Sequence, residues 1–277
     1  MKLICQTCIH HCSLDTGQTG MCGARKNENG RIICSNYGKI TALALDPIEK
    51  KPLKMFCPGS LILSVGSYGC NLRCAFCQNH EISMGSYVGS FMGSFVGSFL
   101  SPKELAKKAE EYQKAGNIGL AFTYNEPLVG WEYVRDTAKL VKEAGMKTVL
   151  VTNGTASMDV LEEILPYIDA MNIDLKGFEE GYYRRLGGDL ETVKTFIQRA
   201  KKQCHVELTT LIVPGENDNA RLMEEQAKWM DPKIPLHVTR FFPRYHMTDR
   251  PPTDVQTVYR LANIAAKYVE HVFVGNC

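Results

Sequence analysis

Three cysteines between Cys70 and Cys77 have the spacing of metal ligands. Cys70, Cys74 and Cys77 follow an apolar run of the kind that forms a buried strand. Three thiolates can bind three irons of a 4Fe-4S cube and leave the fourth iron open to a ligand that the protein does not supply. Zinc would need a fourth ligand, for which only His80 is close in sequence. The spacing favours the cluster, and an open iron indicates chemistry rather than electron transfer alone.

A second group of cysteines lies near the N-terminus. Cys5, Cys8, Cys12 and Cys22 supply four thiols, and four ligands saturate a metal. We therefore expect a closed site that holds either a structural zinc or a second 4Fe-4S cluster able to relay electrons. The spacing admits both metals, and free thiols without a metal are a third alternative.

The composition limits the function classes. The chain has 277 residues, of which 44% are hydrophobic and 22% charged, with a net charge of +2. These values argue against a disordered, fibrous or membrane protein and give no global electrostatic attraction to nucleic acid or anionic lipid. We find no targeting segment or membrane span and expect a cytoplasmic location. In a reducing compartment, the 11 cysteines are expected to be metal ligands or catalytic thiols rather than disulfides.

Short apolar runs alternate with amphipathic segments after residue 57. Strands are predicted at 61–65, 118–123, 148–151, 170–173, 206–213, 236–241 and 272–274. Helices are predicted from a capping box at Ser101 to Glu104, and at 128–144, 157–166, 189–203, 217–230 and 253–268. This alternation predicts an α/β fold whose parallel sheet is doubly wound or closed as a full or partial barrel. The chemistry should lie at the carboxyl ends of its strands.

The chain is predicted to have two domains. Residues 1–57 are expected to form a Cys-rich metal-binding module, and residues 58–277 the catalytic core. Residues 85–100 consist of four tandem Gly-Ser-aromatic-aliphatic tetrapeptides. This repeat is interpreted as a low-complexity insertion, with a mobile flap beside the cysteine loop as the alternative.

The cysteine loop, with Phe76 before its last cysteine, resembles the CxxxCxΦC signature of radical S-adenosylmethionine (SAM) enzymes. The resemblance implies a partial (βα)6 TIM-like barrel and a 4Fe-4S cluster whose open iron binds SAM. It further implies reductive cleavage of SAM to methionine and a 5′-deoxyadenosyl radical that abstracts hydrogen from a substrate. The electron would come from a donor of the flavodoxin or ferredoxin type.

The strand ends carry further motifs of this family. Glu126, with Asn125 beside it, lies in a Thr-Tyr-Asn-Glu-Pro sequence where the family has Gly-Gly-Glu-Pro. The resemblance implies that Glu126 holds the SAM ammonium, an interaction that suits a carboxylate. Both glycines of the family motif are replaced here. The polar side chains of Thr152 and Asn153 could meet the ribose, although Asn-Gly is also a common turn.

Five more residues complete the predicted site. Asp174 and Lys176 resemble the Asp-Leu-Lys of glycyl-radical activating enzymes, where these side chains line the SAM and substrate pocket. Lys176 is therefore also a candidate catalytic residue, and a structural ion pair is the alternative. Pro214 lies in a Pro-Gly turn similar to one that contacts adenine in the family. Arg240 could pair with a carboxylate, and His246 is either a cofactor contact or a structural histidine.

The closest resemblance is to AmmeMemoRadiSam-type radical SAM proteins, which are kin of the pyruvate formate-lyase activating enzymes. It depends on Asp46 to Leu53, Pro58 to Ser60 and Pro251 to Thr253, in addition to the motifs above. The substrate is expected to be a protein or peptide, and a glycyl-radical-enzyme activase is the alternative. Val151 departs from the aspartate that activating enzymes carry before Thr-Asn-Gly. The alternative of another class is a non-catalytic iron-sulfur or zinc-binding interaction protein.

Overall fold

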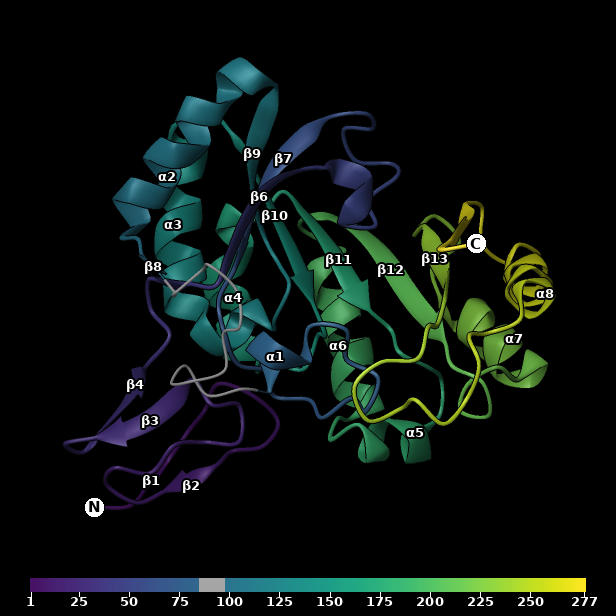
Figure 1. Ribbon diagram of the computed structural model, residues 1–277, viewed down its shortest axis with the longest axis horizontal. Coiled ribbons are helices and arrows are strands. Elements are labelled where there is room, and N and C mark those ends of the chain that lie inside the picture. The colour runs from purple at the N-terminus through teal and green to yellow at the C-terminus, as the bar shows by residue number, and fades with distance from the viewer. Residues whose placement is uncertain (85–97) are drawn as a thin grey trace.

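The computed structural model describes residues 1–84 and 98–277 and has an eight-stranded sheet at its centre (Figure 1). The order is β14-β13-β12-β11-β10-β9-β7-β6, and every neighbouring pair is parallel except β6 and β7. The strands are β6 (Ala42–Pro47), β7 (Leu61–Gly66), β9 (Asn117–Phe122), β10 (Lys147–Thr152), β11 (Ala170–Asp174), β12 (His205–Ile212), β13 (Leu236–Arg240) and β14 (Val272–Gly275). The predicted α/β fold with a parallel sheet is confirmed, and each predicted strand is present within one residue of its expected ends.

The predicted helices are also present. They are α2 (Pro102–Glu111), α3 (Trp131–Glu143), α4 (Met158–Ile164), α6 (Leu190–Ala200), α7 (Ala220–Trp229) and α8 (Val255–Ala265). The capping box forms as expected, because Ser101 Oγ accepts from the Glu104 backbone while the Glu104 carboxylate accepts from Ser101 N–H. Two short helices, α1 (His80–Ser83) and α5 (Glu180–Arg185), were not predicted.

The two faces of the sheet bury different partners because side chains alternate along each strand. Leu63 and Leu120 pack in the large core that includes side chains of α2, α3, α4, α6, α7 and α8. Ile62 and Ala121 point to the other face and pack against Ile48, within the segment that joins β6 to β7. The helices therefore cover one face, while this connecting segment covers part of the other.

The connecting segment is anchored by side chains of distant strands. Leu53 is fully buried, and the carbonyl of Pro52 accepts from Asn172 Nδ2 at 2.9 Å. Glu207 on β12 accepts from the backbone N–H groups of Lys54 and Met55 at 2.9 and 2.8 Å. Because His205 begins β12, the Glu207 contacts lie toward the amino end of that strand, while Asn172 lies in the middle of β11. The opposite ends of the strands are thereby left for the loops that carry the predicted site.

The first 40 residues form small hairpins beside the sheet (Figure 1). The hairpins pair β1 (Leu3–Ile4) with β2 (Ser13–Leu14) and β3 (Arg25–Glu28) with β4 (Arg31–Cys34). β5 (Lys39–Ile40) instead pairs with β8 (Ser98–Phe99), which lies much later in the chain. The division at residue 57 stays a prediction, and pairing with the central sheet begins at Ala42. Residues 85–97 of the tetrapeptide repeat lie outside the described residues.

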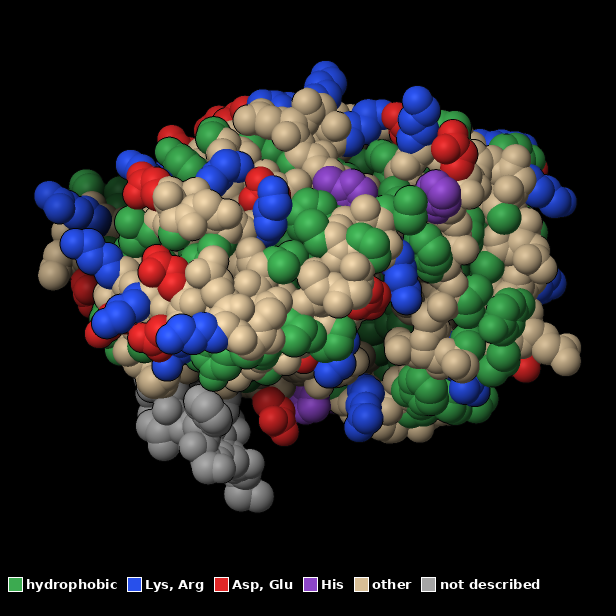
Figure 2. All heavy atoms as spheres, turned by 90° about the horizontal axis from the view of Figure 1, so that it is seen from above, with side chains coloured by type: hydrophobic (Ala, Val, Ile, Leu, Met, Phe, Trp, Pro, Cys, Tyr) green, Lys and Arg blue, Asp and Glu red, His purple; other side chains and the backbone are tan. Residues whose placement is uncertain are grey.

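One face of the molecule is seen in Figure 2. Acidic and basic side chains are interspersed on the face seen in Figure 2. Within residues 1–84 and 98–277, no helix combines the length and the apolar character that crossing a bilayer requires.

Candidate functional site

The Cys70 loop connects the end of β7 to α1. Gly69 has a φ of 93°, and a side chain there would meet the carbonyl of Cys22, so this position requires glycine. The same carbonyl accepts from Cys70 N–H at 3.2 Å, and Arg73 N–H donates to Leu186 O at 2.7 Å. Backbone hydrogen bonds to two separate segments therefore hold the loop in place.

The three predicted cluster ligands belong to or pack against one apolar cluster of side chains. Cys74 is 7% exposed and packs with Leu72 and Phe76, while Cys70 and Cys77 pack against the same cluster and are less deeply buried. Phe76 meets Phe241 edge to face, with ring centroids 6.4 Å apart. The loop thus gathers the thiols in an apolar setting beside the end of β13.

The environment of these thiols fits an iron-sulfur cluster. Soft thiolates are the usual ligands of such clusters, and N–H groups near the sulfurs tune them. Leu72 N–H and Asn153 Nδ2 approach Cys70 Sγ at 3.4 and 3.8 Å. Burial raises the pKa of Cys70 and raises that of Cys74 to about 11, so metal binding must displace their protons. Among the described residues, no three Cys, His, Asp or Glu side chains already surround a common point as metal ligands do, and the thiols must turn to do so.

Glu126 lies in the turn after β9 and is 4% exposed. Its Oε1 accepts from Thr152 Oγ1 at 2.8 Å and from Leu128 N–H at 3.0 Å, and its Oε2 accepts from Asn153 N–H at 2.7 Å. In the described part of the chain, Glu126 has no ion-pair partner. Burial consequently raises the pKa of Glu126 to about 7, against the lowering effect of its hydrogen bonds.

Asn153 links this carboxylate to the cysteine loop. Its backbone N–H holds Glu126, while its side-chain Nδ2 reaches Cys70 Sγ and donates to Asn71 Oδ1 at 2.9 Å. Asn125 has a similar bridging role, because its Oδ1 accepts from Ser67 N–H at 3.0 Å and its Nδ2 donates to Gly69 O at 3.0 Å. The ends of β7, β9 and β10 are therefore joined by polar side chains.

Tyr124 accounts for one departure from the family motif. It has a φ of 73°, a conformation that favours glycine. Its ring packs over Gly66, its hydroxyl donates to Asp46 Oδ2 at 2.7 Å, and Lys51 Nζ lies 4.7 Å from the ring centroid. Asn79 Nδ2 donates to its carbonyl at 2.8 Å. The sequence did not predict this network, although the tyrosine at position 124, where the family has glycine, was a signal that could have indicated it.

Asp174 and Lys176 form an ion pair at the end of β11, with Nζ to Oδ2 at 2.9 Å. The Lys176 side chain is 16% exposed. Burial alone would lower the pKa of Lys176, but the charge of Asp174 and the thiol of Cys74 outweigh burial and raise it. Lys176 is thus a stable cation near Cys74, where it can balance the negative charge of thiolates.

The last three predicted residues lie farther along the same edge. His246 is exposed, and its backbone N–H donates to Ala75 O at 2.9 Å, so its loop contacts the Cys70 loop. The carbonyl oxygen of Pro214 accepts a hydrogen bond from Arg250 Nη1 at 2.9 Å. Arg240 donates to Thr253 O at 2.7 Å and stacks on Phe242, and none of its described contacts is with the cysteine loop.

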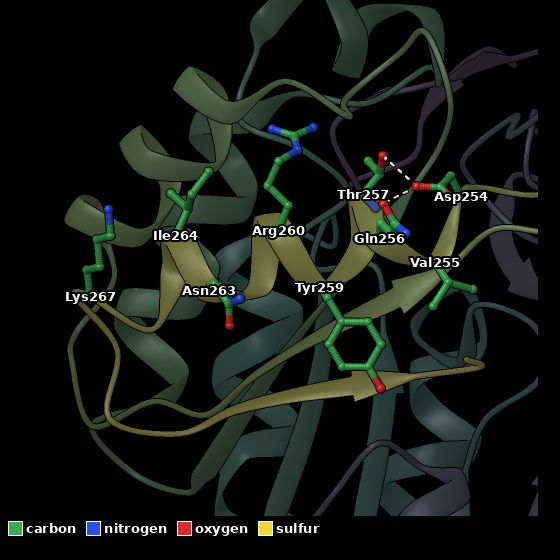
Figure 3. Close-up of a pocket in the computed structure, with 9 residues that line it drawn as sticks. All are labelled: Asp254, Val255, Gln256, Thr257, Tyr259, Arg260, Asn263, Ile264 and Lys267. Atoms are coloured by element: carbon green, nitrogen blue, oxygen red, sulfur yellow. Dashed lines mark hydrogen bonds between the residues drawn. The ribbon is translucent and has the colours of Figure 1, made fainter.

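The four N-terminal cysteines line one small cavity between the hairpins and the core. A larger hollow of about 810 Å³ lies along α8 (Figure 3). The side chains that line it run from Asp254 to Lys267, and none of them belongs to the strand-end site.

Comparison with known proteins identifies the family. The family model of the radical SAM superfamily matches residues 64–225, which is more than half of the chain. The chain belongs to the radical SAM superfamily. It is therefore an enzyme of radical SAM type, and membership implies a 4Fe-4S cluster and SAM as cofactors.

The chain is also similar to individual proteins and solved structures. An uncharacterized protein of Methanocaldococcus jannaschii is 37% identical over 281 residues, which cover 99% of this chain and 81% of that protein. Pyruvate formate-lyase 1-activating enzyme of Escherichia coli is 26% identical over 54% of this chain, and the match spans only 61% of that enzyme. Streptococcus suis SuiB bound to SAM has a TM-score of 0.58 at 14% identity, over 76% of this chain and 48% of SuiB. The structural likeness supports the shared fold.

Proposed function

We propose that this enzyme binds a 4Fe-4S cluster through Cys70, Cys74 and Cys77, and uses it to cleave SAM reductively. When bound, the cluster and SAM supply hydrogen-atom abstraction by a 5′-deoxyadenosyl radical. The observation that carries the proposal is the link through Asn153, which contacts Cys70 with its side chain and Glu126 with its backbone. A thiol loop and a buried carboxylate are thereby fixed side by side at the ends of parallel strands.

Glu126 is proposed to hold the ammonium of SAM. Its three present partners are neutral donors, so a cation is the partner that would favour its ionised form. Asn125 fixes the turn that presents this carboxylate, and Thr152 orients one of its oxygens. Charge-assisted hydrogen bonds of this kind are roughly twice as strong as neutral ones.

The remaining residues are proposed to shape the pocket. Lys176 would balance the charge of the cluster thiolates, and Asp174 holds Lys176 in place. Phe76, packed against Phe241, would exclude water from one side of the cluster. Pro214 and His246 are proposed to border the nucleoside. Arg240 would have to break its hydrogen bond to the Thr253 carbonyl before it could pair with a ligand carboxylate.

The proposed substrate is a protein or peptide, and the electron donor a flavodoxin or ferredoxin. The similarity to pyruvate formate-lyase activating enzymes supports a protein substrate. It also supports the second candidate function, activation of a glycyl-radical enzyme. Val151, which stands where activating enzymes carry aspartate, favours a different peptide substrate over that second candidate.

Anaerobic reconstitution tests the proposal. The reduced protein with a full cluster should convert SAM to methionine and 5′-deoxyadenosine. Cys204→Ala, which changes a thiol outside both cysteine groups, should behave like the wild type. A fully loaded wild-type protein that forms no 5′-deoxyadenosine would overturn the proposal. Incubation with a glycyl-radical enzyme then separates the two candidates, since only an activase would produce a glycine-centred EPR doublet.

A further inference from the structure

We propose that Cys5, Cys8, Cys12 and Cys22 bind a single zinc ion that fastens the N-terminal hairpins to the Cys70 loop. This inference does not depend on SAM chemistry, because it concerns a separate set of thiols. It also decides between the two metals that the cysteine spacing leaves open.

The backbone brings the four cysteines to one place. Cys5 and Cys12 face each other at the end of the β1–β2 pair, where Cys5 N–H donates to Cys12 O at 2.9 Å. Facing residues in such a pair have Cβ atoms about 5 Å apart, which suits two ligands of one ion. Gly20 lies against Cys12 Sγ, and the turn after it delivers Cys22. Cys8 completes the lining of the same cavity.

The surroundings of these thiols supply hydrogen-bond donors to the sulfur atoms, although burial raises the pKa of Cys8 to about 11 and also raises that of Cys22. The backbone N–H groups of His10 and of Ala24 form hydrogen bonds with Cys8 and Cys22, respectively. A similar contact is present in the cysteine loop, where the N–H of Leu72, two residues after Cys70, donates to Cys70 Sγ. Arg25 lines the cavity, its side chain is 3% exposed, and its Nε lacks a hydrogen-bond partner among the described residues. A buried N–H donor without an acceptor is costly, and a metal-bound thiolate would supply the acceptor.

The space favours one ion over a cluster. The cavity between the cysteines has a volume of about 10 Å³, close to the minimum that one water molecule needs. A 4Fe-4S cube contains eight atoms and needs more room than a single ion. Zinc with four thiolates needs only the tetrahedral centre, with Zn–S distances of about 2.3 Å. Among the described residues, no three Cys, His, Asp or Glu side chains already surround a common point, so the thiols would have to turn toward the ion.

Other candidate ligands nearby already have partners. Cys34 Sγ donates to Asn36 Oδ1 at 3.0 Å and does not line the cavity. His10 Nε2 bonds to Asn71 O at 2.7 Å, and His11 Nδ1 bonds to Gln6 Oε1 at 3.1 Å. The four cysteines therefore form a complete and closed ligand set, which is typical of structural zinc.

The position of the site explains what the ion would do. Cys22 O accepts from Cys70 N–H, and His10 bonds to the carbonyl of Asn71. Ile9 N–H donates to Thr155 O at 3.3 Å, two residues after Asn153. A zinc ion would lock residues 5–22 together and, through them, fix the cysteine loop and the turn after β10.

Metal analysis of the full chain tests this proposal. The triple variant with Cys70, Cys74 and Cys77 changed to Ala removes the proposed cluster site. We expect it to retain about one zinc per chain, with an X-ray absorption spectrum of four sulfur neighbours at about 2.3 Å. Adding Cys8→Ala or Cys22→Ala should abolish stoichiometric zinc and lower the melting temperature. Cys34→Ala and Cys204→Ala, placed on the same background, should retain the metal.

The outcomes separate this inference from the proposed function. Iron retained by the triple variant would identify a second cluster and overturn zinc. Zinc that survives Cys8→Ala, or a triple variant without metal, would also overturn the proposal. If the cysteine variants do not fold, the X-ray absorption spectrum of zinc in the wild-type protein tests the proposal. Any ligand set other than four sulfurs would contradict the proposed zinc site. A positive zinc result with no SAM cleavage would leave this inference standing while the proposed function fails.

Discussion

Glu126 and Glu207 are both buried glutamates of the same sheet, but they lie near opposite ends of its strands. Glu126 follows the carboxyl end of β9, whereas Glu207 lies near the amino end of β12 and is 0% exposed. Burial raises the pKa of Glu126 to about 7. Burial also opposes ionisation of Glu207, yet hydrogen bonds from His205, His237 and two backbone N–H groups lower its pKa to about 2.

The difference lies in the partners rather than in the burial. Glu207 accepts from two imidazoles, at 2.9 and 2.6 Å, and from the backbone of the segment that it anchors. Its hydrogen bonds stabilise the fold. Glu126 accepts from neutral groups alone and is the carboxylate that a cationic ligand would stabilise. A buried carboxylate therefore marks a binding site when its surroundings leave its charge unbalanced.

The largest expected effect tests whether the carboxyl ends carry the chemistry. Cys74→Ala should abolish formation of 5′-deoxyadenosine, because it removes one of the three proposed cluster ligands. Product chromatography and iron content measure this loss. Glu207→Gln, at the other end of the sheet, should still cleave SAM at a temperature where it is folded. Full activity in Cys74→Ala would contradict the assignment of the cluster site.

Glu207→Gln should instead reduce stability. A folded-state pKa lowered from 4.5 to about 2 stabilises the folded protein on the order of 3 kcal/mol at neutral pH. This contribution is fully present above pH 4.5 and disappears as the pH falls toward 2. Urea unfolding at pH 7 measures the loss in the variant. Unchanged stability would show that the two histidines do not stabilise the ionised carboxylate.

Glu126→Gln should weaken SAM binding while the protein remains folded. Losing a hydrogen bond to a charged partner removes about 2 kcal/mol, which corresponds to roughly thirtyfold in affinity. Equilibrium binding of SAM to the reconstituted enzyme tests this. Glu132→Gln alters a glutamate that pairs with Arg25 and serves as the control that should retain affinity. Equal weakening in both variants would indicate a general structural effect.

The same glutamate should make SAM binding depend on pH. The pKa of Glu126 is about 7, so below that pH the carboxyl must lose a proton before it can pair with an ammonium. Affinity should fall about tenfold between pH 8 and pH 6. Glu207→Gln should keep this dependence and Glu126→Gln should lose it. Parallel pH profiles for all three proteins would exclude Glu126 as the titrating group.

The smallest expected effect concerns the hydrogen bond between Tyr124, in the turn after β9, and Asp46 on β6. Tyr124→Phe removes the hydroxyl that donates to Asp46 and should lower the free energy of unfolding by about 1 kcal/mol. The ring over Gly66 is retained, so SAM affinity should change little. Tyr37→Phe, which removes a comparable 2.7 Å bond to Asp136, is the matched control. A large loss of SAM binding in Tyr124→Phe alone would show that this network positions Glu126.

The sequence predicted the parallel strands and the Cys70 loop because their signals are local. Apolar runs mark the strands, and a capping box marks the start of α2. α5 was missed because it has only six residues. β6 was missed because it is a partly exposed antiparallel strand that ends in Pro47. In these cases the local pattern carries little periodicity.

The partners of the buried charges could not be predicted. Arg25 meets Glu132 across 107 residues, and Glu207 accepts from the backbone of Lys54 across 153 residues. Nothing in the sequence around Glu126 or Glu207 distinguishes their surroundings, which depend on which strand ends meet in space. The family motif identified Glu126, whereas Glu207 became visible only through its contacts.

The contacts of the first residues also bear on how the chain is made. Thr7 accepts from Ser157 and Ile9 donates to Thr155, so during synthesis this segment lacks its partners until β10 has emerged, after two complete strand–helix units. Closing such a long loop is entropically unfavourable until its destination is structured. The hairpins should therefore dock late, over strands that have already assembled. A truncated nascent chain that ends with β10 at Thr152 would lack both docking residues.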